Sequence, residues 1–117
     1  MILVTGSSGL VGKSLTTQLL HAGYGVRGVA RSSPPNLVGS WYEFAPIGDF
    51  SEVSNWQTLL AGVSTIVHTI ARVHIMDDKA MSPLDEFRKL NVQATLDLAA
   101  QAAAEGVKRF IFISSIT

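Results

Sequence analysis

Short apolar runs alternate with longer segments of helical periodicity along the whole chain. Apolar runs of four to eight residues predict buried strands, and apolar positions recurring every three to four residues predict helices. We expect strands at Ile2–Thr5, Gly25–Ala30, Trp41–Phe44, Thr65–His68 and Arg109–Ser114, and helices at Leu10–Ala22, about Glu52–Ala61 and Pro83 to about Glu105. The first helix is expected to bury Leu15, Leu19 and Leu20.

This alternation of strands and helices predicts a single α/β domain over residues 1–117. Helical crossovers between apolar strands favour a doubly wound, Rossmann-type parallel sheet, with strand order 3-2-1-4-5. In such a sheet, ligands bind outside the carboxyl ends of the strands. Three polar or glycine-rich segments fall at that edge: Thr5–Gly12, His68–Ala71 and Ser114–Ser115.

Gly6, Gly9 and Gly12 stand between the first apolar run and the first helix, with the spacing G-x-x-G-x-x-G. A strand, a tight glycine turn and a helix N-terminus together form a site for a phosphate group. Side chains at Gly6 or Gly9 would obstruct a pyrophosphate, and Gly12 would allow close packing of the helix on the strand. The pattern predicts a dinucleotide site.

A nucleotide-triphosphate loop is a rival interpretation, because Gly12-Lys13-Ser14 matches the end of G-x-x-x-x-G-K-[ST]. The first glycine of that motif would have to stand at Ser7. Such enzymes also need an acidic residue near the end of a later strand to organise magnesium. The predicted strands end in His68 and Ser114, which disfavours this interpretation. A glycine turn without any ligand remains an alternative.

Composition narrows the class of protein further. The chain has 117 residues, a net charge of zero, 15% charged residues and no cysteine. Zero net charge gives no broad basic field for nucleic acid, and the absence of cysteine excludes disulfides and thiolate metal sites. We expect no metal site, since no suitable ligands are spaced around His68. With no visible signal peptide and no apolar run of about 18 residues, we expect a cytoplasmic protein outside the membrane.

The segment Thr5-Gly6-Ser7-Ser8-Gly9-Leu10-Val11-Gly12 resembles the fingerprint of extended short-chain dehydrogenases/reductases, the NAD(P)-dependent nucleotide-sugar epimerase/dehydratase group. The likeness continues through Gly48-Asp49-Phe50, Ile66-Val67-His68, Leu90-Asn91-Val92 and Lys108 to Ser115. Within the group, the stretches 68–74 and 87–92 look similar to bacterial UDP-glucose 4-epimerase-like proteins. The resemblance assigns Gly6, Ser7, Ser8, Gly9, Leu10, Val11 and Gly12 to cofactor binding.

The residues after the second strand bear on the choice of cofactor. An acidic residue about 20 positions past the glycines would bind the ribose 2′-hydroxyl of NAD. Ala30 stands there, followed by Arg31 and Ser32. Arginine can pair with a 2′-phosphate, with Ser32 and Ser33 adding hydrogen bonds, which favours NADP over NAD. A solvated loop charge is the alternative reading of Arg31.

The resemblance implies further cofactor contacts. Asp49 would accept a hydrogen bond from the adenine amino group and Phe50 would back the ring, although Asp49 could equally cap the next helix. His68, Thr69, Ile70 and Ala71 would lie along the nicotinamide-side ribose. Asn91 would help to organise the active site, or would be a buried asparagine satisfied by backbone.

The family's reaction begins with hydride transfer at C4 of a sugar and uses a serine or threonine together with a Tyr-x-x-x-Lys pair. The resemblance makes Ser115 the catalytic serine. The two tyrosines, Tyr24 and Tyr42, are followed four positions on by Gly28 and Pro46, so the pair is absent. The resemblance also implies that residues 1–117 form an incomplete Rossmann domain, truncated after the fifth strand, without the last sheet strands and the substrate domain. We therefore expect this chain to bind cofactor but to be inactive alone.

Three functions stay open at this point. The resemblance implies a UDP-sugar epimerase first, with a nucleotide-sugar substrate and often a homodimeric assembly. An NADP-dependent 4-keto-sugar reductase or dehydratase is the second function, and a non-catalytic dinucleotide-binding regulatory module is the third.

Overall fold

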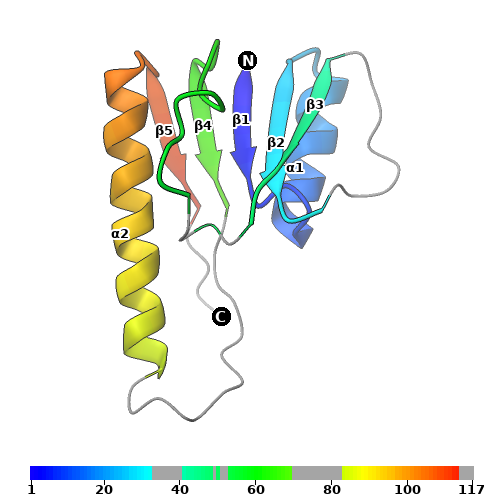
Figure 1. The fold of residues 1–117 in the computed structure, drawn as a ribbon. Coiled ribbons are helices and arrows are strands. Elements are labelled where there is room, and N and C mark those ends of the chain that lie inside the picture. Colours follow the sequence, from blue (N-terminus) through cyan, green and yellow to red (C-terminus); the bar gives the residue numbers. More distant parts are fainter. Residues whose placement is uncertain (33–40, 49, 51–52, 70–82, 114–117) are drawn as a thin grey trace.

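The computed structural model describes residues 1–32, 41–48, 50, 53–69 and 83–113, with the side chains of 83–91 left out. Figure 1 shows a parallel sheet with two long helices. The elements are β1 (Ile2–Thr5), α1 (Leu10–His21), β2 (Val26–Ala30), β3 (Tyr42–Pro46), β4 (Thr65–His68), α2 (Pro83–Ala104) and β5 (Arg109–Phe112).

The sheet has the order β3-β2-β1-β4-β5, and every neighbouring pair is parallel. Both predictions are confirmed. The register aligns Thr5 of β1 with Val29 of β2 and His68 of β4. These strands therefore end together, and the segments that follow them meet at one edge.

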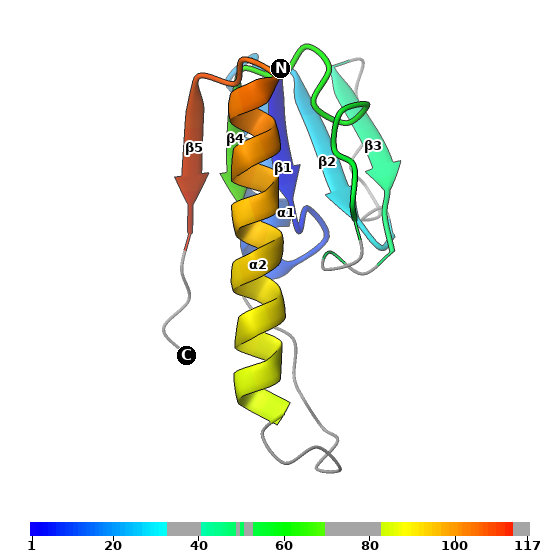
Figure 2. The ribbon, with the colours of Figure 1, turned by 60° about the vertical axis from the view of Figure 1, so that its left-hand side comes forward.

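The two helices cover opposite faces of the sheet, as a comparison of Figures 1 and 2 shows. Register and the alternation of side chains place Leu3, Val29 and Ile66 on one face. That face packs against α2, Phe50 and the segment 53–63. The buried cluster there comprises Leu3, Val29, Phe50, Trp56, Leu60, Val63, Ile66, Ala94, Leu98 and Ala102.

The predicted helix from Glu52 to Ala61 is wrong. Residues 53–56 have no regular structure and 57–62 form turns. Only isolated turn hydrogen bonds form within the segment, such as that from the Leu60 N–H to the Trp56 carbonyl at 2.9 Å, and side chains satisfy other backbone groups. Gln101 of α2 accepts a hydrogen bond from the Trp56 N–H at 2.6 Å and donates one to the Ser54 carbonyl at 3.0 Å. The Asn55 side chain accepts the Gln57 N–H at 2.9 Å. Trp56 and Leu60 reach the core from this irregular segment.

The expected buried face of the first helix also needs correction. Leu15, Leu19 and Leu20 are only partly buried. Gly12 and Thr16 are the buried residues of α1, and at Gly12 the helix lies so close to the loop after β1 that a Cβ would overlap the Gly6 carbonyl group. The observed ends of β2 and β3 differ from the predicted ones by one or two residues. Ser114, the predicted end of the fifth strand, lies outside the described residues.

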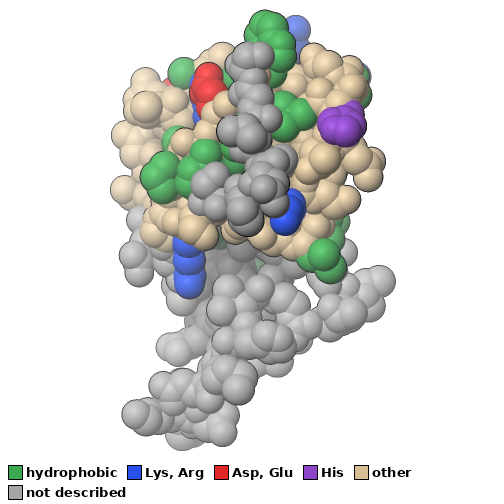
Figure 3. All heavy atoms as spheres, turned by 90° about the vertical axis from the view of Figure 1, so that its right-hand side faces the viewer, with side chains coloured by type: hydrophobic (Ala, Val, Ile, Leu, Met, Phe, Trp, Pro, Cys, Tyr) green, Lys and Arg blue, Asp and Glu red, His purple; other side chains and the backbone are tan. Residues whose placement is uncertain are grey.

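The surface of the described residues includes apolar side chains on an edge strand. β5 is an edge strand, and Ile111 and Phe112 on it are about half exposed. On the side seen in Figure 3, the described charged side chains are few and scattered among backbone and uncharged side chains. Among the described helices none is both long and apolar enough to cross a membrane. The described residues as a whole contain no group of three or more His, Asp or Glu that could hold a metal ion.

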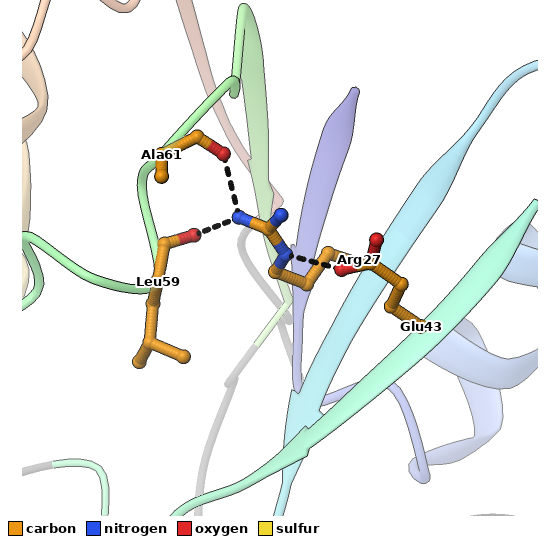
Figure 4. Close-up of polar contacts among 4 residues, drawn as sticks. All are labelled: Arg27, Glu43, Leu59 and Ala61. Carbon is orange, nitrogen blue, oxygen red and sulfur yellow. Dashed lines mark hydrogen bonds and ion pairs between the residues drawn. The ribbon is translucent and has the colours of Figure 1, made fainter.

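Arg27 of β2 ties the irregular segment to the sheet (Figure 4). Its Nη1 donates to the carbonyls of Leu59 at 2.7 Å and Ala61 at 2.8 Å. Its Nε donates to Glu43 of β3 at 3.0 Å. The Arg27 side chain is 16% exposed, while that of Glu43 is 56% exposed. The contact with the Leu59 carbonyl is the better shielded one, and together the two carbonyl contacts hold the turn that leads into β4.

We expect Arg27→Ala to lower the free energy of unfolding by about 1–3 kcal/mol, because two carbonyls lose a charged donor. Glu43→Ala should cost less than about 1 kcal/mol, since an exposed ion pair contributes little. Urea denaturation followed by circular dichroism measures both. Equal losses in the two variants would contradict the ranking of the contacts.

Candidate functional site

Gly6 and Gly12 shape the turn after β1 in different ways. Gly6 has a φ of +67°, a backbone conformation that glycine adopts without strain. Its carbonyl accepts a hydrogen bond from the Gly9 N–H at 3.0 Å. A Cβ on Gly12 would overlap the Gly6 carbonyl group. The absence of a side chain at Gly12 therefore lets the first turn of α1 rest directly on the loop after β1.

The N-terminus of α1 is open to a ligand. Gly9 is the N-cap residue, no side chain caps the helix, and its first turn holds no acidic residue. Lys13 N–H is the first to bond back into the helix, to the Gly9 carbonyl at 2.8 Å. Leu10 is 91% exposed and Val11 51% exposed, so the backbone between them is accessible. Free N–H groups and the positive end of the helix dipole suit a phosphate oxygen. The residues present thus fit a pyrophosphate.

The end of β2 lies directly beside this loop. The N–H groups of Gly6 and Ser7 both donate to the Val29 carbonyl, at 2.9 and 3.3 Å. Arg31 and Ser32 follow β2 and are exposed. Their backbone is therefore at the edge of the sheet that the glycine loop occupies.

Ser7 behaves differently from its neighbour Ser8. Ser8 is exposed, whereas Ser7 is fully buried. The Ser7 Oγ lies 2.7 Å from the point where a Cβ on Gly28 would stand. Ser7 therefore packs over the bare backbone of Gly28 in β2, and its side chain supports the loop from beneath.

The ends of β1 and β4 are joined through Thr5 and Thr69. Thr69 N–H donates to Thr5 Oγ1 at 3.1 Å. The Thr69 hydroxyl donates to the Thr5 carbonyl at 2.5 Å and approaches the Gly6 carbonyl at 3.4 Å. Both threonines are buried. Thr69 thus reaches the glycine loop from the β4 side, while Gly12 contacts the same carbonyl group from α1.

His68 is enclosed rather than presented to a ligand. It is 1% exposed. Its Nδ1 lies 2.6 Å from Thr5 Oγ1, and its Nε2 lies 3.1 Å from Thr95 Oγ1 of α2. Its ring packs against Phe50, with ring centroids 4.7 Å apart, and against Phe112, at 5.3 Å. Burial lowers the pKa of His68 from 6.5 to about 4, so the ring is neutral at pH 7.

The other site residues predicted from the sequence differ in how far the structure describes them. Phe50 is described and packs in the core against His68 and Trp56, and its contact with adenine stays a prediction. Asn91 lies within α2, but its side chain is outside the described part. The remainder fall on residues that the structure does not describe: Asp49, Ile70, Ala71, Ser33 and the catalytic candidate Ser115.

Thr5 and Thr95 hydrogen-bond to His68 but are not among the site residues predicted from the sequence. Thr5 was placed at the ligand edge but given no role, and it joins His68 to Thr69. Thr95 of α2 lies beside His68, and no sequence motif or residue spacing indicates a role for it. Only its position next to the buried Ala94, on a helix covering the sheet, could have singled it out.

Acidification should destabilise the fold through His68. The folded pKa of about 4 lies below the unfolded value of 6.5, so the unfolded chain binds the extra proton first. The contribution is full above about pH 6.5 and is lost as pH falls towards 4, by about 3 kcal/mol in total.

Urea denaturation at several pH values, comparing the unaltered chain with His68→Asn, measures this loss. The difference in unfolding free energy between the two should shrink from pH 7 to pH 4. Thr58→Val, at an exposed threonine that carries no titratable group, serves as the control and should leave the pH dependence unchanged. Parallel curves for the unaltered chain and His68→Asn would refute the assignment.

The chain is similar in sequence and in fold to known proteins. Residues 2–117 match the model of the NAD dependent epimerase/dehydratase family. A UDP-glucose 4-epimerase of Vibrio cholerae is 41% identical over 116 residues, which cover 98% of this chain and 34% of that protein. The chain thus spans about a third of the length of this relative.

Solved structures share the sheet. A short-chain dehydrogenase/reductase superfamily protein from Agrobacterium tumefaciens with bound NAD is 33% identical, with a TM-score of 0.75, over 98% of this chain and 32% of that one. MoeE5 in complex with UDP-glucose and NAD is 30% identical, with a TM-score of 0.74, over 98% of this chain and 36% of that one. With the family model matched from β1 to beyond β5 and the expected strand order present, the chain belongs to the NAD dependent epimerase/dehydratase family.

Proposed function

We propose that this chain is the dinucleotide-binding part of an NAD(P)-dependent enzyme that acts on a nucleotide sugar. The observation that carries the proposal is the uncapped N-terminus of α1, held by Gly12 against the Gly6 turn at the carboxyl end of β1. The backbone N–H groups of Ser8, Leu10, Val11 and Gly12 would hold the pyrophosphate, since the Gly9 N–H is already donated to the Gly6 carbonyl. When bound, the dinucleotide would supply hydride acceptance and donation.

The adenosine half of the dinucleotide would extend towards β2. Arg31 and Ser32 directly follow that strand, and no carboxylate precedes them at its end. A carboxylate there would repel a 2′-phosphate, whereas the guanidinium can pair with it. We therefore propose a preference for NADP over NAD. The two solved structures reported above contain NAD, so a preference for NADP would distinguish this chain from those proteins.

The other half of the cofactor would extend towards β4. Thr69 follows that strand and lies against the glycine loop. We assign Ile70 and Ala71 to the nicotinamide-side ribose and Asp49 to the adenine on the resemblance alone. The buried ring of His68 would act on the cofactor only through the residues that it holds in place.

Dinucleotide binding to the chain can be measured by isothermal titration calorimetry. We expect NADP to bind more tightly than NAD, and Arg31→Ala to weaken NADP binding about tenfold, because a charge-assisted hydrogen bond is lost. Gly12→Ala should weaken both dinucleotides by more than about tenfold, since its methyl group would displace the Gly6 carbonyl.

Gly25→Ala is the matched control, because its Cβ would meet only ordinary contacts of 3.7 Å or more. It should bind like the unaltered chain. Tight ATP–magnesium binding with no dinucleotide binding would overturn the proposal in favour of a nucleotide-triphosphate loop. Tighter binding of NAD, or an Arg31→Ala variant with unchanged NADP affinity, would overturn the cofactor preference alone.

For the reaction, we propose hydride transfer at C4 of a UDP-sugar, with epimerisation as the outcome. The similarity to a UDP-glucose 4-epimerase and to a protein solved with UDP-glucose supports this substrate class. The alternatives are a 4-keto-sugar reductase or dehydratase and a non-catalytic dinucleotide-binding module. Ser115 is the candidate catalytic serine of this chain.

The 117-residue chain by itself should not turn over UDP-glucose. It lacks a Tyr-x-x-x-Lys pair, so no side chain of that kind is present to take the hydroxyl proton. Incubation with UDP-glucose and either dinucleotide, followed by chromatographic separation of UDP-glucose from UDP-galactose, should show no conversion. Sustained conversion by the purified chain would disprove this expectation.

A further inference from the structure

Three hydrogen bonds and one longer polar contact run from α2 to the glycine loop. Thr95 of α2 contacts His68, His68 contacts Thr5, and Thr69 donates to Thr5 and approaches the Gly6 carbonyl. The contacts are 3.1, 2.6, 3.1 and 3.4 Å long in that order. They connect a helix on one face of the sheet to the loop between β1 and α1. No residue of this set belongs to the glycine motif except Gly6.

The donors and acceptors assign one tautomer to His68. Thr5 Oγ1 already accepts the Thr69 N–H. If His68 Nδ1 also donated to Thr5 Oγ1, the buried Thr5 hydroxyl hydrogen would need another acceptor, and the described residues offer it none. The Thr5 hydroxyl therefore donates to Nδ1. The proton of the neutral ring lies on Nε2 and is donated to Thr95 Oγ1.

The surroundings keep this arrangement in place. Phe50, Phe110 and Phe112 pack around the ring at centroid distances of 4.7, 6.1 and 5.3 Å. The ring has no freedom to seek other polar partners, so the Thr95 hydroxyl decides how Nε2 is satisfied. A change at Thr95 is transmitted through a rigid ring to Thr5 and from there to Thr69.

We propose that Thr95 is a positioning residue for the dinucleotide site, acting through the Nε2–H tautomer of His68 on Thr5, Thr69 and the Gly6 carbonyl. This inference rests on the proposed function and names a support that the glycine motif does not contain. Thr95 need not touch the cofactor. Its hydroxyl would hold the end of β4 so that Thr69 meets the loop that α1 contacts from the other side.

The test uses three variants of the chain. Thr95→Val keeps the shape of the side chain and removes the hydroxyl, and Thr95→Ser keeps the hydroxyl. Thr58→Val, at an exposed threonine in the turn 57–62, is the control. We expect Thr95→Val to weaken dinucleotide binding about three- to tenfold by calorimetry, while Thr95→Ser and Thr58→Val stay within about twofold. Equal losses in Thr95→Val and Thr95→Ser would overturn the proposal, because packing rather than the hydroxyl would then be responsible. Unchanged affinity in Thr95→Val would also overturn it.

A second measurement needs no ligand, and its first part needs no variant. Nitrogen-15 NMR of the imidazole in the unaltered chain should show the Nε2–H tautomer, and an Nδ1–H tautomer would overturn the proposal. In Thr95→Val, the amide signals of Gly6 and Thr69 should shift, whereas in Thr58→Val they should not. Unshifted Gly6 and Thr69 signals would count against the network. If the unaltered chain binds no dinucleotide while these signals behave as expected, the proposed function fails and the link from Thr95 to the loop stands.

Discussion

The close contact between Gly12 of α1 and the Gly6 carbonyl is the constraint on which the site depends. It brings the start of a helix onto the end of β1 without an intervening side chain. Because α1 has no side-chain cap, its first N–H groups remain available where that strand ends. The positive φ of Gly6 turns the chain sharply enough for the contact to form. The phosphate recognition that we propose rests on this backbone geometry.

The parallel register extends the constraint across the sheet. Thr5 is level with Val29 and His68, so the ends of three strands converge on the glycine loop. Val29 binds the loop's N–H groups from the β2 side, and Thr69 reaches its carbonyl from the β4 side. The proposed cofactor contacts and the structural support of the loop thus come from the same strand ends. This explains why a histidine at such an end is buried and neutral: it holds the site together from within.

The strands and the two long helices could be predicted because each carries its own signal. The apolar run Thr65–His68 and the helix from Pro83 agree with the structure, as does the strand order. The helix expected near Glu52–Ala61 does not form. Its apolar spacing suits a helix, yet Gln101, far along the chain, binds its backbone at Trp56 and Ser54. Local periodicity contains no information about such a partner.

The sequence by itself determined the fold class, the glycine turn and the edge at which the candidate residues gather, because turn chemistry and periodicity are local properties of a chain. Only the tertiary structure decided which side each residue faces. It turned Ser7 and His68 inward, left Leu10 exposed, and joined Thr95 to Thr5 through an imidazole. These outcomes depend on distances between residues remote in sequence, which arise only when the helices pack on opposite faces of the sheet.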